Sequence, residues 1–150
     1  MKEKFFMLIV LLTLPLCAQA KLSSGAERDL CFKEQKQIAN AYNCLSAKAK
    51  KSEKELDKVI QETSKRILAN YDYFTKNKQD AGETVGAIYN KHFLDAQTVW
   101  KNYREKQCLG VSSSIGERAY DYQSYKDQYV INLNKRHIEE IHLMDLPPVG

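Results

Sequence analysis

The feature that most restricts the fold of this chain is the absence of proline from almost its whole length. No proline occurs between Pro15 and Pro147, and only five glycines occur in that interval. Proline interrupts helices, whereas β folds rich in tight turns need many glycines and prolines. An interval this long with so few of both residues predicts an all-α protein.

Apolar residues recur at helical spacing within this interval. Six of them are separated by intervals of three, four or seven and predict one buried stripe on a long helix: Leu56, Val59, Ile60, Ile67, Leu68 and Tyr71. A second set is expected to share one side of the last helix: Ala119, Tyr122, Tyr129, Leu133 and Ile141. These stripes predict helices that pack against one another along their apolar sides.

The same pattern predicts an antiparallel bundle of about four helices. The expected helices cover residues 26–43, 45–76, 83–108 and 117–143. The polar interval 75–82, which ends in glycine, is expected to be a turn. The interval 110–116, GVSSSIG, is the clearest loop, and Ser114 is expected to cap the helix that follows it.

The first 20 residues have the pattern of a secretory signal. Lys2 and Lys4 precede an apolar run of 12 residues, Phe5 to Leu16, and Ala18-Gln19-Ala20 is a small-x-small cleavage pattern. The run is shorter than the roughly 20 residues that a membrane span needs. Lipid attachment at Cys17 is disfavoured because Leu16 is too large for that processing. We therefore expect cleavage of residues 1–20 and a single helical domain, 21–150, in the periplasm.

The charge of the expected mature chain is small and evenly distributed. Removing residues 1–20 leaves 21 basic and 18 acidic residues, a net charge of +3. The lysine-rich segment 46–66 is expected to be a solvated helix surface, and contact with an anionic surface is the alternative. Export makes nucleic acid an improbable partner.

Three cysteines remain in the mature chain: Cys31, Cys44 and Cys108. On one straight helix, Cys31 and Cys44 would be about 20 Å apart, whereas a disulfide requires Cα atoms within roughly 7 Å. If they pair, the helix must break between them, and we expect the break at 40–43. Pairing of either residue with Cys108 stays open, but the short loop favours the local disulfide. Cys108 would then be a free thiol.

The window Phe93 to Cys108, FLDAQTVWKNYREKQC, contains the only tryptophan in the chain. On a helical wheel, one arc of about 140° holds its aromatic residues together with three polar ones. The arc comprises Phe93, Ala96, Gln97, Trp100, Tyr103, Arg104, Gln107 and Cys108. If the arc is buried, the Arg104 guanidinium needs a carboxylate, and Glu53 and Asp57 are the candidates. A binding groove at Arg104 and Gln97 is the alternative interpretation.

Motifs that carry catalysis, metal binding or cofactor binding were not found in the sequence. It has no HExxH, CxxC, phosphate-binding loop or GxSxG, and His137 and His142, five residues apart, do not share a helix face. A redox role for Cys108, with its pKa lowered by neighbouring basic residues, is the least favoured hypothesis. We expect neither an enzyme nor a cofactor, metal or small-molecule substrate.

The same window resembles the LprI-type lysozyme-inhibitor-like domain family, whose signature is L..AQ..W..YR...C. The matching residues are Phe93, Ala96, Gln97, Trp100, Tyr103, Arg104 and Cys108. Weaker similarity at the cysteine pair Cys31 and Cys44, at 50–60, in the Gly-Ser segment after Cys108 and at 133–141 extends the resemblance over about residues 31–141. The family has a fourth cysteine in its last helix, and this chain has none near Gln128 and Tyr129. The resemblance thus implies that Cys108 is unpaired or pairs between molecules.

The resemblance further implies an exported, non-catalytic protein that binds a protein partner, with a lysozyme as first candidate. We expect docking through the loop and the tyrosine-rich last helix, at Ser112, Ser113, Ser114, Tyr122 and Tyr125. Because an inhibitor of a strongly cationic lysozyme should be acidic, a charge of +3 favours a neutral or acidic partner, or recognition by a local acidic patch such as Glu139, Glu140 and Asp145. The alternative function is a structural adaptor that associates weakly with the envelope through helix 46–66.

Overall fold

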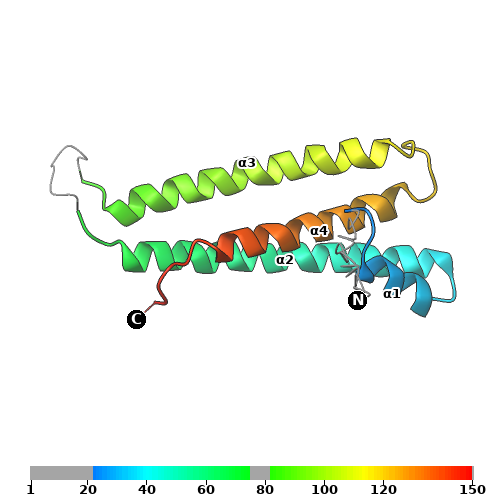
Figure 1. The fold of residues 1–150 in the computed structure, drawn as a ribbon, viewed down its shortest axis with the longest axis horizontal. Coiled ribbons are helices and arrows are strands. Elements are labelled where there is room, and N and C mark those ends of the chain that lie inside the picture. Colours follow the sequence, from blue (N-terminus) through cyan, green and yellow to red (C-terminus); the bar gives the residue numbers. More distant parts are fainter. Residues whose placement is uncertain (1–21, 75–81, 150) are drawn as a thin grey trace, which may run out of the picture.

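A computed structural model describes residues 22–74 and 82–149 of the chain. Its four helices are α1 (Ala26–Glu34), α2 (Ile38–Asn70), α3 (Val85–Ser113) and α4 (Tyr122–His142) (Figure 1). No strand occurs within those two ranges. The prediction of an all-α bundle of about four helices is therefore confirmed. The predicted signal peptide and positions 75–81 of the predicted turn lie outside the described residues.

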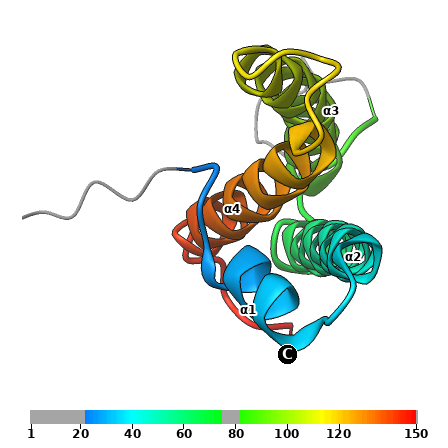
Figure 2. The ribbon, with the colours of Figure 1, turned by 90° about the vertical axis from the view of Figure 1, so that its right-hand side faces the viewer.

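The two long helices α2 and α3 run in opposite directions, and α4 packs against both (Figures 1 and 2). The short α1 lies beside the first part of α2. At the other end of α2, the N–H of Gly86 donates to the carbonyl of Tyr71 at 2.7 Å. A Cβ atom at Gly86 would lie 2.9 Å from that oxygen, so glycine permits this close approach of α3 to α2. None of the helices in the described ranges has the length and apolarity required to cross a bilayer.

The buried apolar side chains form two separate clusters along the bundle. One consists of Cys31, Leu45, Ala49 and Ile131, and the other of Leu56, Ile60, Ile67, Phe93, Ile141 and Leu146. Between Ala49 and Leu56, α2 presents Ser52 and Glu53 to the interior, and α4 presents the fully buried Asn134 beside them. The interior thus changes from apolar to polar and back again along its length.

The disulfide between Cys31 and Cys44 is formed, with Cα atoms 5.8 Å apart, as the local pairing predicted. The predicted position of the helix break is wrong. Residues 40–43 lie inside α2, because Ala41 and Leu45 continue the buried side of that helix. The chain instead turns at residues 35–37, where Gln35 adopts an extended conformation after α1. The predicted single helix 26–43 is therefore two elements.

The predicted loop at GVSSSIG is largely helical. Helix α3 continues to Ser113, and its last serines donate hydrogen bonds to carbonyls of their own helix, from Ser112 to Cys108 at 2.7 Å and from Ser113 to Leu109 at 2.8 Å. Ser114 ends α3 and does not cap α4, because its hydroxyl donates to the carbonyl of Val111 at 2.6 Å. The connection to α4 covers residues 114–121 and includes Gly116, whose φ of 86° is in the left-handed region.

The remaining helix boundaries differ from prediction by a few residues. Helix α2 ends at Asn70, where we expected 76, and α4 begins at Tyr122, where we expected 117. Within the predicted stripe of α2, Leu68 is exposed, because the buried side of the helix passes through Thr63 and Ile67. Boundary errors of this size arise because helix ends are determined by capping contacts that periodicity does not detect.

Candidate functional site

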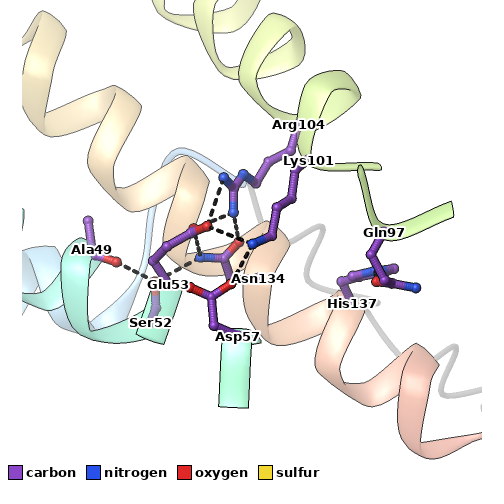
Figure 3. A network of polar contacts seen from close by, with 9 residues as sticks. All are labelled: Ala49, Ser52, Glu53, Asp57, Gln97, Lys101, Arg104, Asn134 and His137. Carbon is purple, nitrogen blue, oxygen red and sulfur yellow. Dashed lines mark hydrogen bonds and ion pairs between the residues drawn. The ribbon is translucent and has the colours of Figure 1, made fainter. Parts of the chain in front are cut away.

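The polar layer between the two apolar clusters is centred on the ion pair of Arg104 and Glu53 (Figure 3). Both terminal nitrogens of Arg104, on α3, contact the Glu53 carboxylate on α2, and the Nη2–Oε1 distance is 3.2 Å. Arg104 Nη1 also donates to Asn134 Oδ1 on α4 at 2.7 Å. Only 8% of Arg104 is exposed. The predictions that Arg104 is buried and that Glu53 is its partner are therefore confirmed.

Asn134 extends this layer to a serine of α2. Its side-chain amide donates to Ser52 Oγ at 3.0 Å and to Glu53 Oε2 at 3.3 Å, and the Ser52 hydroxyl donates to the carbonyl of Ala49 at 2.8 Å. These hydrogen bonds join polar side chains of three helices, and among the described residues Arg104 Nε is the one buried side-chain nitrogen or oxygen without a partner. Such mutual satisfaction is what allows polar side chains to be buried at low cost.

Asp57, the other expected partner of Arg104, pairs with a different residue. Its carboxylate contacts the ammonium group of Lys101, which also lies 3.6 Å from Glu53 Oε1 (Figure 3). Lys101 and Arg104 are three residues apart on α3, and Glu53 and Asp57 are four residues apart on α2. Two basic residues of one helix thus face two acidic residues of the next.

A second polar contact joins α3 to α4 through Gln97 and His137. His137 Nε2 lies 2.7 Å from Gln97 Oε1, and Nδ1 lies 2.8 Å from Glu140 Oε2. The imidazole stacks on the indole of Trp100 with ring centroids 3.8 Å apart and nearly parallel planes. Both ring nitrogens therefore face side-chain oxygens. His137 is thus a buried structural residue in contact with the signature residues Gln97 and Trp100.

The predicted buried arc of α3 is narrower than expected. Phe93, Gln97, Arg104 and Cys108 are buried and Trp100 is partly buried, whereas Tyr103 and Ala96 are exposed. The predicted burial of Tyr103 is wrong because α3 packs only against α2 and α4, which leaves the far edge of the arc open to solvent. Gln97 and Arg104 are occupied by contacts within the protein, which argues against a groove at these two residues.

Cys108 is buried and forms no disulfide with the other described cysteines. Burial raises the pKa of its thiol to about 11, and the opposing charge of Arg104 does not compensate for that effect. At neutral pH the side chain is a thiol that solvent cannot reach. The charge of Arg104 acts in the expected direction, but burial outweighs it, so the pKa is not lowered and the redox hypothesis loses its support.

The five residues predicted to dock a partner differ in their exposure to solvent. Ser112 is fully buried, so its predicted exposure on a loop is wrong. Ser113 and Ser114 are exposed at the end of α3, whereas Tyr122 and Tyr125 are partly buried at the start of α4. All of these residues adjoin the connection 114–121, which therefore brings the exposed ones to the same end of the bundle.

The most exposed aromatic residue at this end is Tyr120, which is 70% exposed and was absent from the predicted site. Its ring packs edge-to-face on Tyr42, with centroids 5.2 Å apart, and Tyr42 packs in the same way on Phe32 at 5.3 Å. The Tyr42 hydroxyl donates to Asp121 Oδ1 at 2.6 Å. Burial, followed by the hydrogen bond to Asp121, raises the pKa of Tyr42 to about 12, so its hydroxyl remains a donor at neutral pH.

Arg28 contacts other members of the cluster around Tyr120. Its guanidinium lies 3.6 Å from Asp121 Oδ2 and packs over the rings of Phe32 and Tyr125 at 4.9 and 5.4 Å. The contacts connect α1, α2 and the connection before α4. Sequence periodicity could not identify this cluster, because its members come from three different elements. The four tyrosines within residues 120–129 were the only signal.

Comparison with known proteins gave one match. A protein-family model described as "Lysozyme inhibitor LprI" matches residues 31–141. No curated protein and no solved structure matches the chain. The matched range begins at the first disulfide cysteine and ends with the last buried residue of α4, so it includes the polar layer and, apart from Arg28, the cluster around Tyr120.

Proposed function

The chain belongs to the LprI lysozyme-inhibitor family, and on that premise we propose that it is an exported, non-catalytic protein that binds a protein partner, with a lysozyme as the first candidate. Within residues 22–74 and 82–149, no group of three or more His, Cys, Asp or Glu side chains is arranged to hold a metal ion. The most polar part of the interior is used for contacts among helices. Recognition is accordingly assigned to the surface.

Export is proposed from the amino-terminal sequence. The basic start, the apolar run and Ala18-Gln19-Ala20 support cleavage after residue 20, which would leave Lys21 at the amino terminus in the periplasm. The intact mass of the protein recovered from the periplasmic fraction should correspond to residues 21–150. A mass that retains residues 1–20 would contradict this part of the proposal.

The proposed docking surface is the tyrosine end, which we define as Ser113, Ser114, Tyr120, Tyr122 and Tyr125. The observation that supports it most directly is the exposure of Tyr120 on a supported aromatic cluster. Tyrosine is enriched among residues that dominate binding energy at protein interfaces. Fixed aromatic side chains also lose little conformational entropy when a partner binds. Ser113 and Ser114, exposed at the end of α3, would contribute polar contacts.

The charge of the protein restricts the type of partner. The expected mature chain carries +3, and Arg118 is an exposed basic residue in the connection that forms the tyrosine end. Electrostatic repulsion would slow its encounter with a strongly cationic lysozyme. We therefore propose a partner whose contact surface is neutral or acidic. Glu139, Glu140 and Asp145 are exposed near the far end of α4 and provide the alternative acidic patch.

Tyr120→Ala is expected to weaken partner binding by about 30-fold, which corresponds to about 2 kcal/mol for a central aromatic contact. The measurement is binding and inhibition with lysozymes of several structural types, one of which must first respond to the parent protein. Fold stability should change little, because most of the Tyr120 side chain is in solvent.

The matched control is Leu143→Ala, which removes a large side chain that is 83% exposed just after the C-terminal end of α4. It should leave binding unchanged. Equal losses in both variants, or no loss in Tyr120→Ala, would rule out the tyrosine end as the docking surface. Failure of the parent protein to bind any lysozyme would redirect the search to other envelope proteins.

A further inference from the structure

The outward side of α2 carries a row of lysines. Eleven of its residues fall within an arc of about 100° at 100° per residue, and all eleven are exposed: Asn40, Asn43, Ala47, Lys50, Lys51, Lys54, Lys58, Gln61, Lys65, Leu68 and Ala69. The opposite side of the helix packs against the rest of the bundle, as the view along α2 shows (Figure 2). No acidic residue lies within the arc. We call its five lysines the lysine face.

The charges of the lysine face are only partly balanced. Lys51 pairs with Glu55 and Lys58 with Glu62, each at 3.7 Å and between exposed side chains. Such exposed pairs are weak and are screened by salt. Within the described ranges, Lys50, Lys54 and Lys65 form no ion pair. Five lysines and two glutamates leave +3 on this side of one helix.

The geometry of the face is linear. From Lys50 to Lys65 the helix rises about 22 Å at 1.5 Å per residue, and α2 is a single uninterrupted helix over this range. Lysine carries a compact charge on a flexible stem, which suits a diffuse anionic surface better than the geometric recognition that arginine provides. A row of lysines on a rigid helix can therefore contact a planar array of negative charges simultaneously.

From this geometry we propose that the lysine face of α2 binds the surface of an anionic phospholipid bilayer, so that the protein lies at the membrane while the tyrosine end stays available to a partner. Each lysine near such a surface adds about fivefold to the partition coefficient at low salt. The inference is independent of the proposed lysozyme binding, because it uses different residues on a different element.

Discrete phosphate recognition is less consistent with the structure. The groove beside the lysine face has a volume of about 210 Å³ and is lined by Lys48, Lys51 and Lys135. Two of these lysines pair with Glu55 and Glu27, which line the same groove. The groove therefore has little net charge with which to hold a single anion. The excess positive charge lies on the open face.

The test is sedimentation of the protein with vesicles of phosphatidylglycerol and phosphatidylcholine, and with vesicles of phosphatidylcholine alone. The parent protein should bind only the anionic vesicles, and binding should be lost between about 20 mM and about 200 mM salt. Lys50→Gln/Lys54→Gln/Lys65→Gln should lower the partition coefficient about 100-fold, since three charges at about fivefold each are removed. Its melting temperature and lysozyme binding should match those of the parent.

The matched control is Lys33→Gln/Lys91→Gln/Lys106→Gln, which removes three exposed lysines from α1 and α3 and changes the net charge equally. The partition coefficient of this control on anionic vesicles should fall by less than about fivefold. Equal losses in the two triple variants would show that net charge alone acts and would overturn the proposal. The same conclusion would follow from binding to neutral vesicles, or from equally tight binding of a soluble polyanion such as heparin, which would indicate an acidic macromolecule in place of the bilayer.

Discussion

Arg104→Ala should lower the free energy of unfolding by about 3 kcal/mol, because it leaves the Glu53 carboxylate and the buried Asn134 amide without their main partner. This value is at the lower end of the range of free-energy losses for breaking a buried ion pair. The reason is that about one third of the Glu53 side chain is exposed, so water can partly replace the guanidinium. In a domain of this size the melting temperature should fall by roughly 10 °C. Urea titration measures the change in free energy directly.

Lys106→Ala is the control for Arg104→Ala, because Lys106 lies on the same helix and is exposed. It should change the free energy of unfolding by less than about 0.5 kcal/mol. A double-mutant cycle of Arg104→Ala with Glu53→Ala then isolates the pair, and its coupling energy should be about 1 kcal/mol or more. If Arg104→Ala lowers the free energy of unfolding no more than Lys106→Ala does, the Arg104 side chain is exposed to water in solution.

Removal of the disulfide by Cys31→Ala/Cys44→Ala should also lower the free energy of unfolding by about 3 kcal/mol. The crosslink closes a loop of 13 residues, and the chain-entropy estimate for such a loop is of that size. Phe32 and Tyr42 lie one and two residues from the two cysteines and support Tyr120. The same variant should therefore weaken partner binding at the tyrosine end.

Reducing agent provides the control for this second prediction. It should lower the melting temperature of the parent protein and leave that of the double variant unchanged. Thiol counting on the oxidised parent should find one group, Cys108, and alkylation should require denaturant because that side chain is buried. A reactive thiol at Cys44, or equal stability of the parent and the variant, would contradict the assignment.

The parts of the fold that follow from local rules could be predicted from the sequence. Scarcity of proline and glycine predicted an all-α protein, apolar spacing predicted about four helices, and loop length predicted the disulfide of Cys31 and Cys44. The burial of Arg104 also followed, because Phe93 and Trp100 lie on the same side of its helix and a buried guanidinium requires a carboxylate. In each case the deciding residues lie on one element or form an obligatory pair.

The buried side of α4 could not be predicted from apolar spacing, because most of it is polar. It includes Ser124, Asp127, Gln128, Tyr129, Ile131, Asn134, His137 and Ile141. The stripe of Ala119, Tyr122, Tyr129, Leu133 and Ile141 was expected to define this side, but only its third and fifth members are buried. The polar residues are buried because they meet partners on other helices, as Asn134 meets Ser52 and Gln128 accepts from the Arg28 N–H at 2.8 Å.

The candidate docking surface was only partly predictable for a related reason. The tyrosines near the start of α4 were identified, but Tyr120 packs on Tyr42, which in turn packs on Phe32, and both of these residues are distant from Tyr120 in sequence. The serines were assigned to a loop because glycine and serine favour turns. Their hydroxyls instead bond to carbonyls of α3, which keeps Ser112 and Ser113 helical.

The polar layer between the two apolar clusters fixes the offset of the helices along their axes. Leucine and isoleucine side chains can pack in several offsets, and two helices joined only by them can shift by one turn, about 5.4 Å, at modest cost. Here a shift of α3 towards Ala49 would set Arg104 against an apolar cluster, where its charge would have no counterpart, and a shift the other way, towards Asp57, would leave Glu53 without the guanidinium. One arginine thereby excludes the offsets that hydrophobic packing alone would tolerate.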